Sequence, residues 1–189
     1  MEYQQISRVE AAPAQPLAHA LLALNNTHVQ ELSWLQPRRL EYLVEHAFMA
    51  RRIGHLDAFI VAFDQDAPYD SPNFLWFRAR YPRFVYVDRI VVAPSARGRG
   101  YARLLYRDLF DQAEQAGHER IVCEVNAQPP NPASDALHAA LGFSEVGRAS
   151  IHDDSKTVRY LLRPLRQRIT HQGMTMTTHL EAGALCAPG

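Results

Sequence analysis

Near the N-terminus, apolar residues recur at the spacing of two amphipathic helices, after a short apolar segment at Tyr3–Val9 that predicts a strand. The first helical set ends at Asn25-Asn26, and the second follows Pro37, a residue suited to the first turn of a helix. Each set places its apolar residues on one face, so both helices are expected to cover a core. The sets are Leu17, Ala20, Leu21 and Leu24, and then Leu40, Leu43, Val44, Ala47 and Phe48.

Between residues 56 and 92 the pattern changes to short apolar runs, which predict three strands. They are Leu56–Phe63, Phe74–Ala79 and Phe84–Val92, separated by an acidic loop over Asp64–Pro72 and a turn over Arg80–Arg83. No helical pattern lies between these runs, so the strands are expected to pair antiparallel.

Beyond residue 100 the pattern alternates between helix and strand. A helix is predicted from Tyr101 to about Ala116, and the next strand alternates over 121–125. A crossover helix of this kind places its two flanking strands parallel. After the Pro-rich loop Asn126–Asn131 come a short helix, Ala133–Leu141, and two strands, Phe143–Ile151 and Thr157–Leu162, predicted to form a hairpin.

The turn between Val92 and Tyr101 has the composition of an anion site. Gly98 and Gly100 leave the backbone open to a bulky ligand, and Arg97, Arg99 and Arg103 add fixed charge. The first N–H groups of a helix lack intrahelical partners and carry partial positive charge, which suits phosphate or pyrophosphate. The alternative is a plain helix start, with tight-turn glycines and solvated arginines.

Two motifs in this arrangement resemble the GNAT superfamily of acyl-CoA N-acyltransferases. Arg97-Gly98-Arg99-Gly100-Tyr101-Ala102 matches the family's R/Q-x-x-G-x-G/A motif, after an apolar strand and a Pro. In the stretch from Asn131 to Phe143, the residues Asn131 and Leu141-Gly142-Phe143 also match, whereas the position of the family's tyrosine holds His138. The order of the elements is that of the GNAT fold, so the resemblance covers roughly residues 3–163.

The resemblance implies an α+β fold: a mixed, mostly antiparallel sheet of about seven strands with four helices and splayed central parallel strands. Residues 1–164 are assigned to this one N-acetyltransferase domain. From Leu165 the periodicity is lost, so 165–189 is expected to be a tail, either disordered or an added arm.

Acetyl-CoA is the cofactor that the resemblance implies. The glycine turn would hold its pyrophosphate through Arg97, Gly98, Arg99, Gly100, Tyr101, Ala102 and Arg103. The backbone of Ile90, Val91 and Val92 would pair with the pantetheine arm as an added strand does, and would supply a donor to the thioester oxygen. Asn131 would bond the pantetheine, or would simply cap its helix.

The resemblance also gives candidates for proton transfer. His138 stands where the family's tyrosine protonates the leaving thiolate; the alternative is that it packs or contacts the cofactor, with solvent supplying the proton. For the base that takes the amine proton, the carboxylates near the expected cleft are Glu31, Asp88 and Glu124, each of which could instead be a surface or network carboxylate. Cys123 lies on an apolar strand face, so we interpret it as a core residue and not as a nucleophile.

The loop from His28 to Trp34 mixes polar and apolar residues and could line the acceptor cleft. Alternatively, Trp34 and Leu35 fill the core.

Composition narrows the function classes. Lys plus Arg equals Asp plus Glu at 20 each, so the chain has no net positive charge that would attract nucleic acid or an anionic membrane. No apolar run is long enough for a membrane span, no signal peptide or metal-ligand spacing is present, and two cysteines form no disulfide framework. A cytoplasmic location is the expectation.

The leading hypothesis is an acetyl-CoA-dependent N-acetyltransferase that acts by direct attack in a ternary complex, with a small amine or amino acid as acceptor. A protein N-terminus or lysine is the second acceptor class, a CoA-binding module without turnover is the alternative function, and a homodimer stays open. Nucleic-acid binding through Arg97 to Gly100 is the weakest reading, because no aromatics interleave with the arginines.

Overall fold

The computed structural model describes residues 6–10, 13–28, 32–151 and 156–166. Within them, seven strands form one sheet, in the order β1-β2-β3-β4-β5-β7-β6. The strands are β1 (Ile6–Arg8), β2 (Met49–Ile53), β3 (Ala58–Asp64), β4 (Val85–Val92), β5 (Arg120–Gln128), β6 (Ser144–Ile151) and β7 (Lys156–Pro164). The helices are α1 (Gln15–Asn26), α2 (Pro37–Glu45), α3 (Pro72–Arg78), α4 (Tyr101–Gln115) and α5 (Pro132–Ala140), with a 3-10 turn at Pro94–Ala96.

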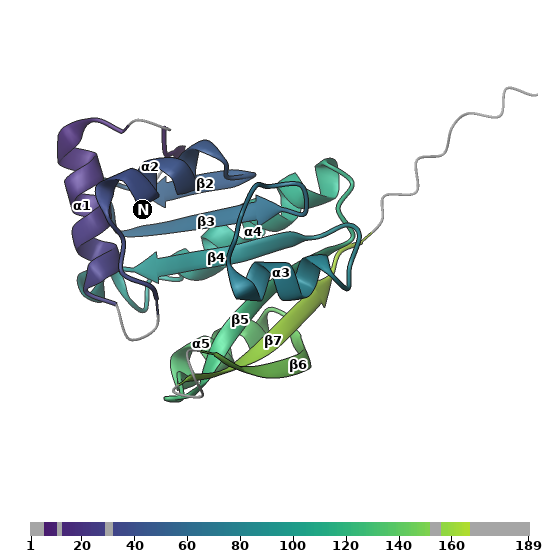
Figure 1. Ribbon diagram of the computed structural model, residues 1–189. Helices are drawn as coiled ribbons and strands as arrows, with labels where there is room; N and C mark the ends of the chain where they lie inside the picture. The colour runs from purple at the N-terminus through teal and green to yellow at the C-terminus, as the bar shows by residue number, and fades with distance from the viewer. Residues whose placement is uncertain (1–5, 11–12, 29–31, 152–155, 167–189) are drawn as a thin grey trace, which may run out of the picture.

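The helices cover both faces of the sheet (Figure 1). On β3, Phe59, Val61 and Phe63 pack with α1, α2 and α3 on one face. Ala58, Ile60 and Ala62 alternate with them and pack with α4 on the other face. The strand is therefore apolar on both sides, which explains why its sequence reads as a continuous apolar run.

Most of the sheet is antiparallel, and the exception positions the site. β4 and β5 pair parallel at only three places, Val85↔Ile121, Tyr86↔Val122 and Val87↔Cys123. Beyond Val87, β4 continues along β3 to Val92, while β5 continues along β7 to Gln128. The two strands therefore diverge, as Figure 1 shows, and the predicted splay of the central parallel strands is confirmed.

The predicted strand Phe74–Ala79 is wrong, because Pro72–Arg78 forms the helix α3. Aromatic residues favour strands in general, but here Asn73, Phe74 and Phe77 are buried at helical spacing while Leu75 and Arg78 face solvent. Ser71-Pro72 was the signal for a helix start that the apolar run concealed. The described chain thus has five helices where four were expected.

The predicted extension of the second helix to Phe48 is also wrong. α2 ends at Glu45, and Met49–Ile53 forms β2, which pairs with β1 and β3. Arg51 and Arg52 interrupt the apolar pattern of this strand and hid it; Arg51 is satisfied by Asp108 (3.4 Å) and Gln112 (3.2 Å) on α4. The total of seven strands is confirmed, with β2 in place of the strand predicted over 74–79.

The end of the described chain packs onto the domain. Leu165 is buried in the same cluster as α4, and its N–H donates to the Glu119 carbonyl oxygen at 2.8 Å. The rest of the predicted tail, from 167 onward, lies outside the described residues. No helix of the described ranges has the length and apolarity that crossing a membrane would need.

Candidate active site

A pocket of about 400 Å³ opens where β4 and β5 diverge. Its walls come from the two strands, from α4 and α5 and from His28 and Leu32 in the segment after α1. Of the predicted site residues, the pocket brings together Ile90, Val91, Val92, Arg97, Ala102, Glu124, Asn131 and His138, and Asp88 with them. Gly98, Arg99, Gly100, Tyr101 and Arg103 lie beside it in the turn and first turn of α4, and Glu31 lies outside the described residues.

The glycine turn has room for a ligand against its backbone. Gly98 (φ 76°) and Gly100 (φ 79°) adopt the left-handed conformation, and a Cβ atom at either would meet nothing within 4 Å. No side chain of the described residues caps the start of α4. Arg97, Arg99 and Arg103 are exposed around it. A helix start with open backbone and three cations fits a phosphate-bearing ligand.

The free edge of β4 adds backbone groups to this site. Ile90 and Val91 pair with Ile60 and Phe59 on β3, which occupies one edge of the strand. In an antiparallel pair, alternate residues direct their N–H and C=O groups away from the partner strand. Because β5 has already diverged, such groups on β4 face the pocket, where an extended ligand can bond to them.

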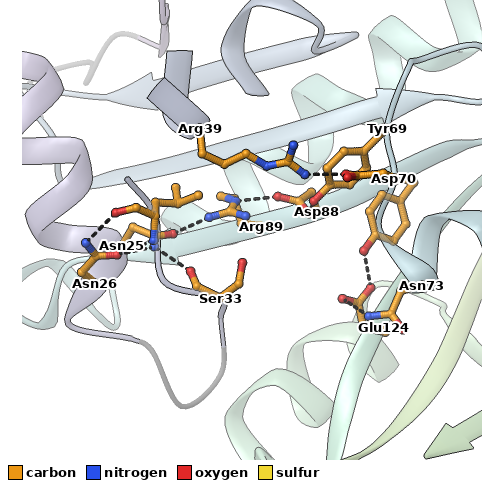
Figure 2. Close-up of polar contacts among 12 residues, drawn as sticks. Asn25, Asn26, Ser33, Arg39, Tyr69, Asp70, Asn73, Asp88, Arg89 and Glu124 are labelled. Atoms are coloured by element: carbon orange, nitrogen blue, oxygen red, sulfur yellow. Dashed lines mark hydrogen bonds and ion pairs between the residues drawn. The ribbon is translucent and has the colours of Figure 1, made fainter. Parts of the chain in front are cut away.

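Glu124 of β5 places a carboxyl group in the pocket wall. Tyr86 Oη donates to its Oε2 at 2.8 Å and Asn73 Nδ2 to its Oε1 at 2.9 Å (Figure 2). Burial raises the pKa of Glu124 to about 7; the Tyr86 bond opposes this rise, Asp88 adds to it, and the Asn73 bond opposes it. A carboxyl group that titrates near neutrality can accept a proton during turnover.

Asp88 of β4 is the second carboxylate of the pocket, and its partners differ. Its Oδ2 accepts from Arg89 Nε at 2.5 Å and its Oδ1 from Tyr69 Oη at 2.5 Å. Arg89 is buried and also donates from Nη1 to Asn25 Oδ1 at 2.7 Å, as Figure 2 shows. Asn25 in turn donates to the Ser33 carbonyl oxygen at 3.1 Å. This network ties the end of α1 and its following loop to β4.

His138 lies at the opposite wall with both ring nitrogens bonded. Its Nδ1 is 2.7 Å from the Ser134 carbonyl oxygen, an acceptor, so Nδ1 carries the hydrogen. Its Nε2 then accepts from Tyr106 Oη at 2.7 Å. Burial lowers the pKa of His138, and the Ser134 bond only partly opposes this. The ring is therefore neutral at pH 7, and the hydrogen shared between Tyr106 Oη and His138 Nε2 is held by Tyr106.

Three further predicted features have clear positions. Asn131 caps α5, because its Oδ1 accepts from Ser134 N at 3.2 Å, and it also lines the pocket. Cys123 is buried, and burial raises the pKa of its thiol, which disfavours the nucleophilic thiolate. In the loop after α1, Leu35 is buried as one alternative had it, whereas Trp34 is 64% exposed.

The sequence prediction missed Asn73, Tyr86, Tyr69, Tyr106 and Asn25 as site partners. Tyr69 lies in the predicted loop Asp64–Pro72, and Asn73 lies between that loop and the predicted strand Phe74–Ala79, so neither side chain had a predicted direction. Tyr86 and Tyr106 fall on the apolar periods of β4 and α4 and look like core residues, which they also are.

The comparisons with known proteins agree with this geometry. The model of the acetyltransferase (GNAT) family matches residues 17–143. The chain belongs to this family. Its similarity spans the glycine turn, the diverging strands and α5, which together line the pocket.

The chain is also 47% identical over 58 residues to phosphinothricin N-acetyltransferase of Streptomyces coelicolor, which spans 31% of this chain and 33% of that protein. The match thus covers about a third of the curated relative. Among solved structures, the ribosomal-protein-S18-alanine N-acetyltransferase of Escherichia coli superposes with a TM-score of 0.63 at 18% identity, covering 89% of this chain and 97% of that one. yncA of Salmonella typhimurium, solved with its cofactor acetyl-CoA, gives 0.66 at 16%, covering 88% and 96%. These two likenesses show the shared fold.

Proposed function

We propose that this chain is an acetyl-CoA-dependent N-acetyltransferase that acetylates the primary amine of a small molecule or amino acid by direct attack in a ternary complex. The observation that carries the proposal is the position of Glu124. A carboxyl group whose pKa is raised to about 7 lines the pocket at the point where β4 and β5 diverge, next to the anion-binding turn. Family membership supplies the acetyltransferase class.

The residues present fit the cofactor. The glycine turn from Arg97 to Arg103 would hold the pyrophosphate, and the free edge of β4 at Ile90–Val92 would hold the pantetheine arm. Bound there, acetyl-CoA supplies an acyl group activated as a thioester. yncA, which has the same fold, was solved with this cofactor.

Glu124 is assigned the role of base. An amine is protonated in water near neutral pH and must lose a proton before its lone pair can attack a carbonyl carbon. The carboxylate oxygens of Glu124 accept that proton, either directly or through one water molecule. Backbone N–H groups of β4 would stabilise the negative charge that develops on the thioester carbonyl oxygen as the nitrogen–carbon bond forms, before the carbon–sulfur bond breaks.

The Tyr106–His138 pair is assigned the proton for the leaving thiolate. Tyr106 Oη holds the hydrogen, and His138 Nε2 accepts it in the resting state at 2.7 Å. This proposal differs from the sequence prediction, which made His138 itself the donor; here His138 positions the Tyr106 hydroxyl. The attacking nitrogen loses a second proton as the amide forms, and solvent returns a proton to the Tyr106 oxygen after each turnover.

The acceptor is proposed from the relatives. The curated relative that matches at 47% identity over 58 residues is named as a phosphinothricin N-acetyltransferase, so phosphinothricin is the first acceptor to test. The pocket holds the carboxyl group of Glu124, which suits an acceptor that carries an amine. A protein N-terminus is the second acceptor class to test, because this chain shares its fold with an enzyme named for acetylating alanine of the ribosomal protein S18. The cytoplasmic location stays a prediction.

A thiol-release assay tests the proposal. The protein is mixed with acetyl-CoA and one acceptor at a time: phosphinothricin, free amino acids, simple alkyl amines and a short peptide with an alanine N-terminus. Release of free CoA that depends on one acceptor, with an acetylated product of matching mass, supports the enzyme. Acetyl-CoA binding without release for any acceptor supports the CoA-binding module instead.

A further inference from the structure

Asn73 lies behind the proposed base, in the first turn of α3. It is 8% exposed and is absent from the described residues that line the pocket. Its amide bridges two elements: Nδ2 donates to Glu124 Oε1 at 2.9 Å, and Oδ1 accepts from Tyr160 Oη on β7 at 3.0 Å. Figure 2 shows the amide beside the Glu124 carboxyl group. Asn73 therefore reaches the site only through Glu124.

The chemistry of the two partners sets the direction of this amide. An ionised carboxylate can only accept hydrogen bonds, so the NH₂ group of Asn73 must face Glu124. Its carbonyl oxygen then faces Tyr160, whose hydroxyl has a hydrogen to donate. The Tyr160 ring is stacked on Trp76 with centroids 4.1 Å apart, which holds the hydroxyl in place. The chain Tyr160, Asn73, Glu124 thus has one consistent polarity, and it favours the ionised carboxyl group.

We infer that Asn73 is a positioning residue, whose amide keeps the Glu124 carboxyl group ionised and directed toward the pocket; this inference rests on the proposed role of Glu124. Two uncharged donors, from Tyr86 and Asn73, hold one carboxylate oxygen each. The remaining lone pairs of both oxygens stay available to a proton from the acceptor. Without Asn73, Glu124 Oε1 loses its hydrogen-bond donor, and the protonated form of Glu124 becomes more stable relative to the ionised form.

The other titratable groups around Glu124 either raise its pKa, as Asp88 does, or are uncharged. The titratable neighbours that interact with it are Asp88 and Tyr86 from β4, Tyr69 from the loop after β3, Tyr106 from α4, Cys123 from β5 and Tyr160 from β7. Asp88 raises the pKa of Glu124, and the Asn73 and Tyr86 bonds lower it against the larger effect of burial. Removing the Asn73 donor should therefore move the titration upward.

The test is Asn73→Leu, which replaces the amide with an apolar side chain of similar size. Protein labelled with ¹³C at the glutamate carboxyl carbon gives the titration of Glu124 by NMR, with the Glu124→Gln variant identifying its signal. Loss of one bond to a charged group should raise the midpoint by about one pH unit or more. The acid limb of kcat/KM should shift by the same amount, which lowers kcat/KM about tenfold at pH 6.

Two matched variants accompany it. Tyr160→Phe keeps the ring on Trp76 but removes the hydroxyl that orients Asn73, and should shift the midpoint in the same direction by less. This variant carries the test if Asn73→Leu does not fold. Leu75→Ala shortens a side chain on the exposed face of the same helix and leaves both donors of Glu124 in place, so its midpoint should equal that of the unaltered protein.

The outcomes separate the two claims. An unchanged NMR midpoint in Asn73→Leu and Tyr160→Phe overturns the role of Asn73, whatever happens to activity. An equal shift in all three variants also overturns it, because packing of α3 would then be the cause. A raised midpoint with an unmoved kinetic limb supports the role of Asn73 and overturns Glu124 as the base.

Discussion

The two carboxylates of the pocket, Asp88 on β4 and Glu124 on β5, differ in what holds them. Asp88 is paired with the buried guanidinium of Arg89 at 2.5 Å, whereas Glu124 accepts from the uncharged Tyr86 and Asn73. A cation beside a carboxylate favours its charge strongly, and neutral donors favour it less. Burial accordingly raises the pKa of Glu124 to about 7. Of two acidic residues in one site, the one without a cation is thus suited to exchange a proton, and the one with a cation to hold a network together.

Glu124→Gln should produce the largest effect and tests this division directly. Gln keeps the shape but cannot take a proton, so kcat should fall by roughly 10² to 10⁴, the usual span for one general base. Acetyl-CoA binding should be nearly unchanged. Steady-state kinetics with the acceptor found in the thiol-release assay measure it. If Asp88→Asn lowers kcat as much as Glu124→Gln does, the assignment of distinct roles is wrong.

Asp88→Asn should instead lower stability. It leaves the Arg89 guanidinium, whose side chain is 2% exposed, without its anion, and breaking a buried pair on one side costs about 3 kcal/mol. Urea unfolding measures the change in free energy. The matched control is Asp70→Asn, which breaks the exposed pair of Asp70 with Arg39 drawn in Figure 2 and should have a much smaller effect. Equal losses in the two variants would contradict the role of the buried pair.

The glycine turn should govern cofactor affinity independently of both carboxylates. At 100 times its dissociation constant, acetyl-CoA should stabilise the unaltered protein by about 2.7 kcal/mol. Gly100→Glu should abolish this ligand-dependent gain in thermal unfolding, since it places a side chain and a negative charge at the anion site. Gly100→Ala imposes the same left-handed strain (φ 79°) without the charge and should keep part of the gain. A full gain in Gly100→Glu would remove the turn from the cofactor site.

The pH dependence of kcat/KM should follow Glu124. The base acts when deprotonated, so kcat/KM should rise about tenfold per pH unit below pH 7 and level off above it, because burial raises the pKa of Glu124 to about 7. Two acceptors with different amine pKa values distinguish the enzyme group from the substrate. A limb that moves with the acceptor would assign it to the amine, and a limb that persists in Glu124→Gln would exclude Glu124.

The Tyr106–His138 pair should show the smallest effect, because water can also protonate a thiolate. Tyr106→Phe and His138→Phe should each lower kcat by about tenfold, at the lower end for an acid, and the double variant should lose no more than either alone. Steady-state kinetics at pH 7 provide the comparison. Weakened acetyl-CoA binding with an unchanged kcat would make His138 a cofactor contact, the alternative reading of its position.

Local features of the sequence determined much of the fold. The periods of α1, α4 and α5 were strong enough to predict them, since an amphipathic helix carries its pattern within a few turns. The glycine turn and the residues around Asn131 and Gly142 identified the family before any coordinates, because backbone access to an anion restricts which residues fit. The splayed strands followed from that resemblance.

Only the tertiary structure decided the environment of each candidate. Residues 72–78 are rich in aromatics, and whether they form a strand or a helix depends on what they pack against, here the rings of Tyr86 and Tyr160. Glu124 and Asp88 differ in their hydrogen-bond and ion-pair partners. The fold brings Asn73 and Tyr86 to Glu124 and directs Arg89 to Asp88. A pKa depends on burial and on neighbours within a few ångströms, and the sequence order of residues does not contain those distances.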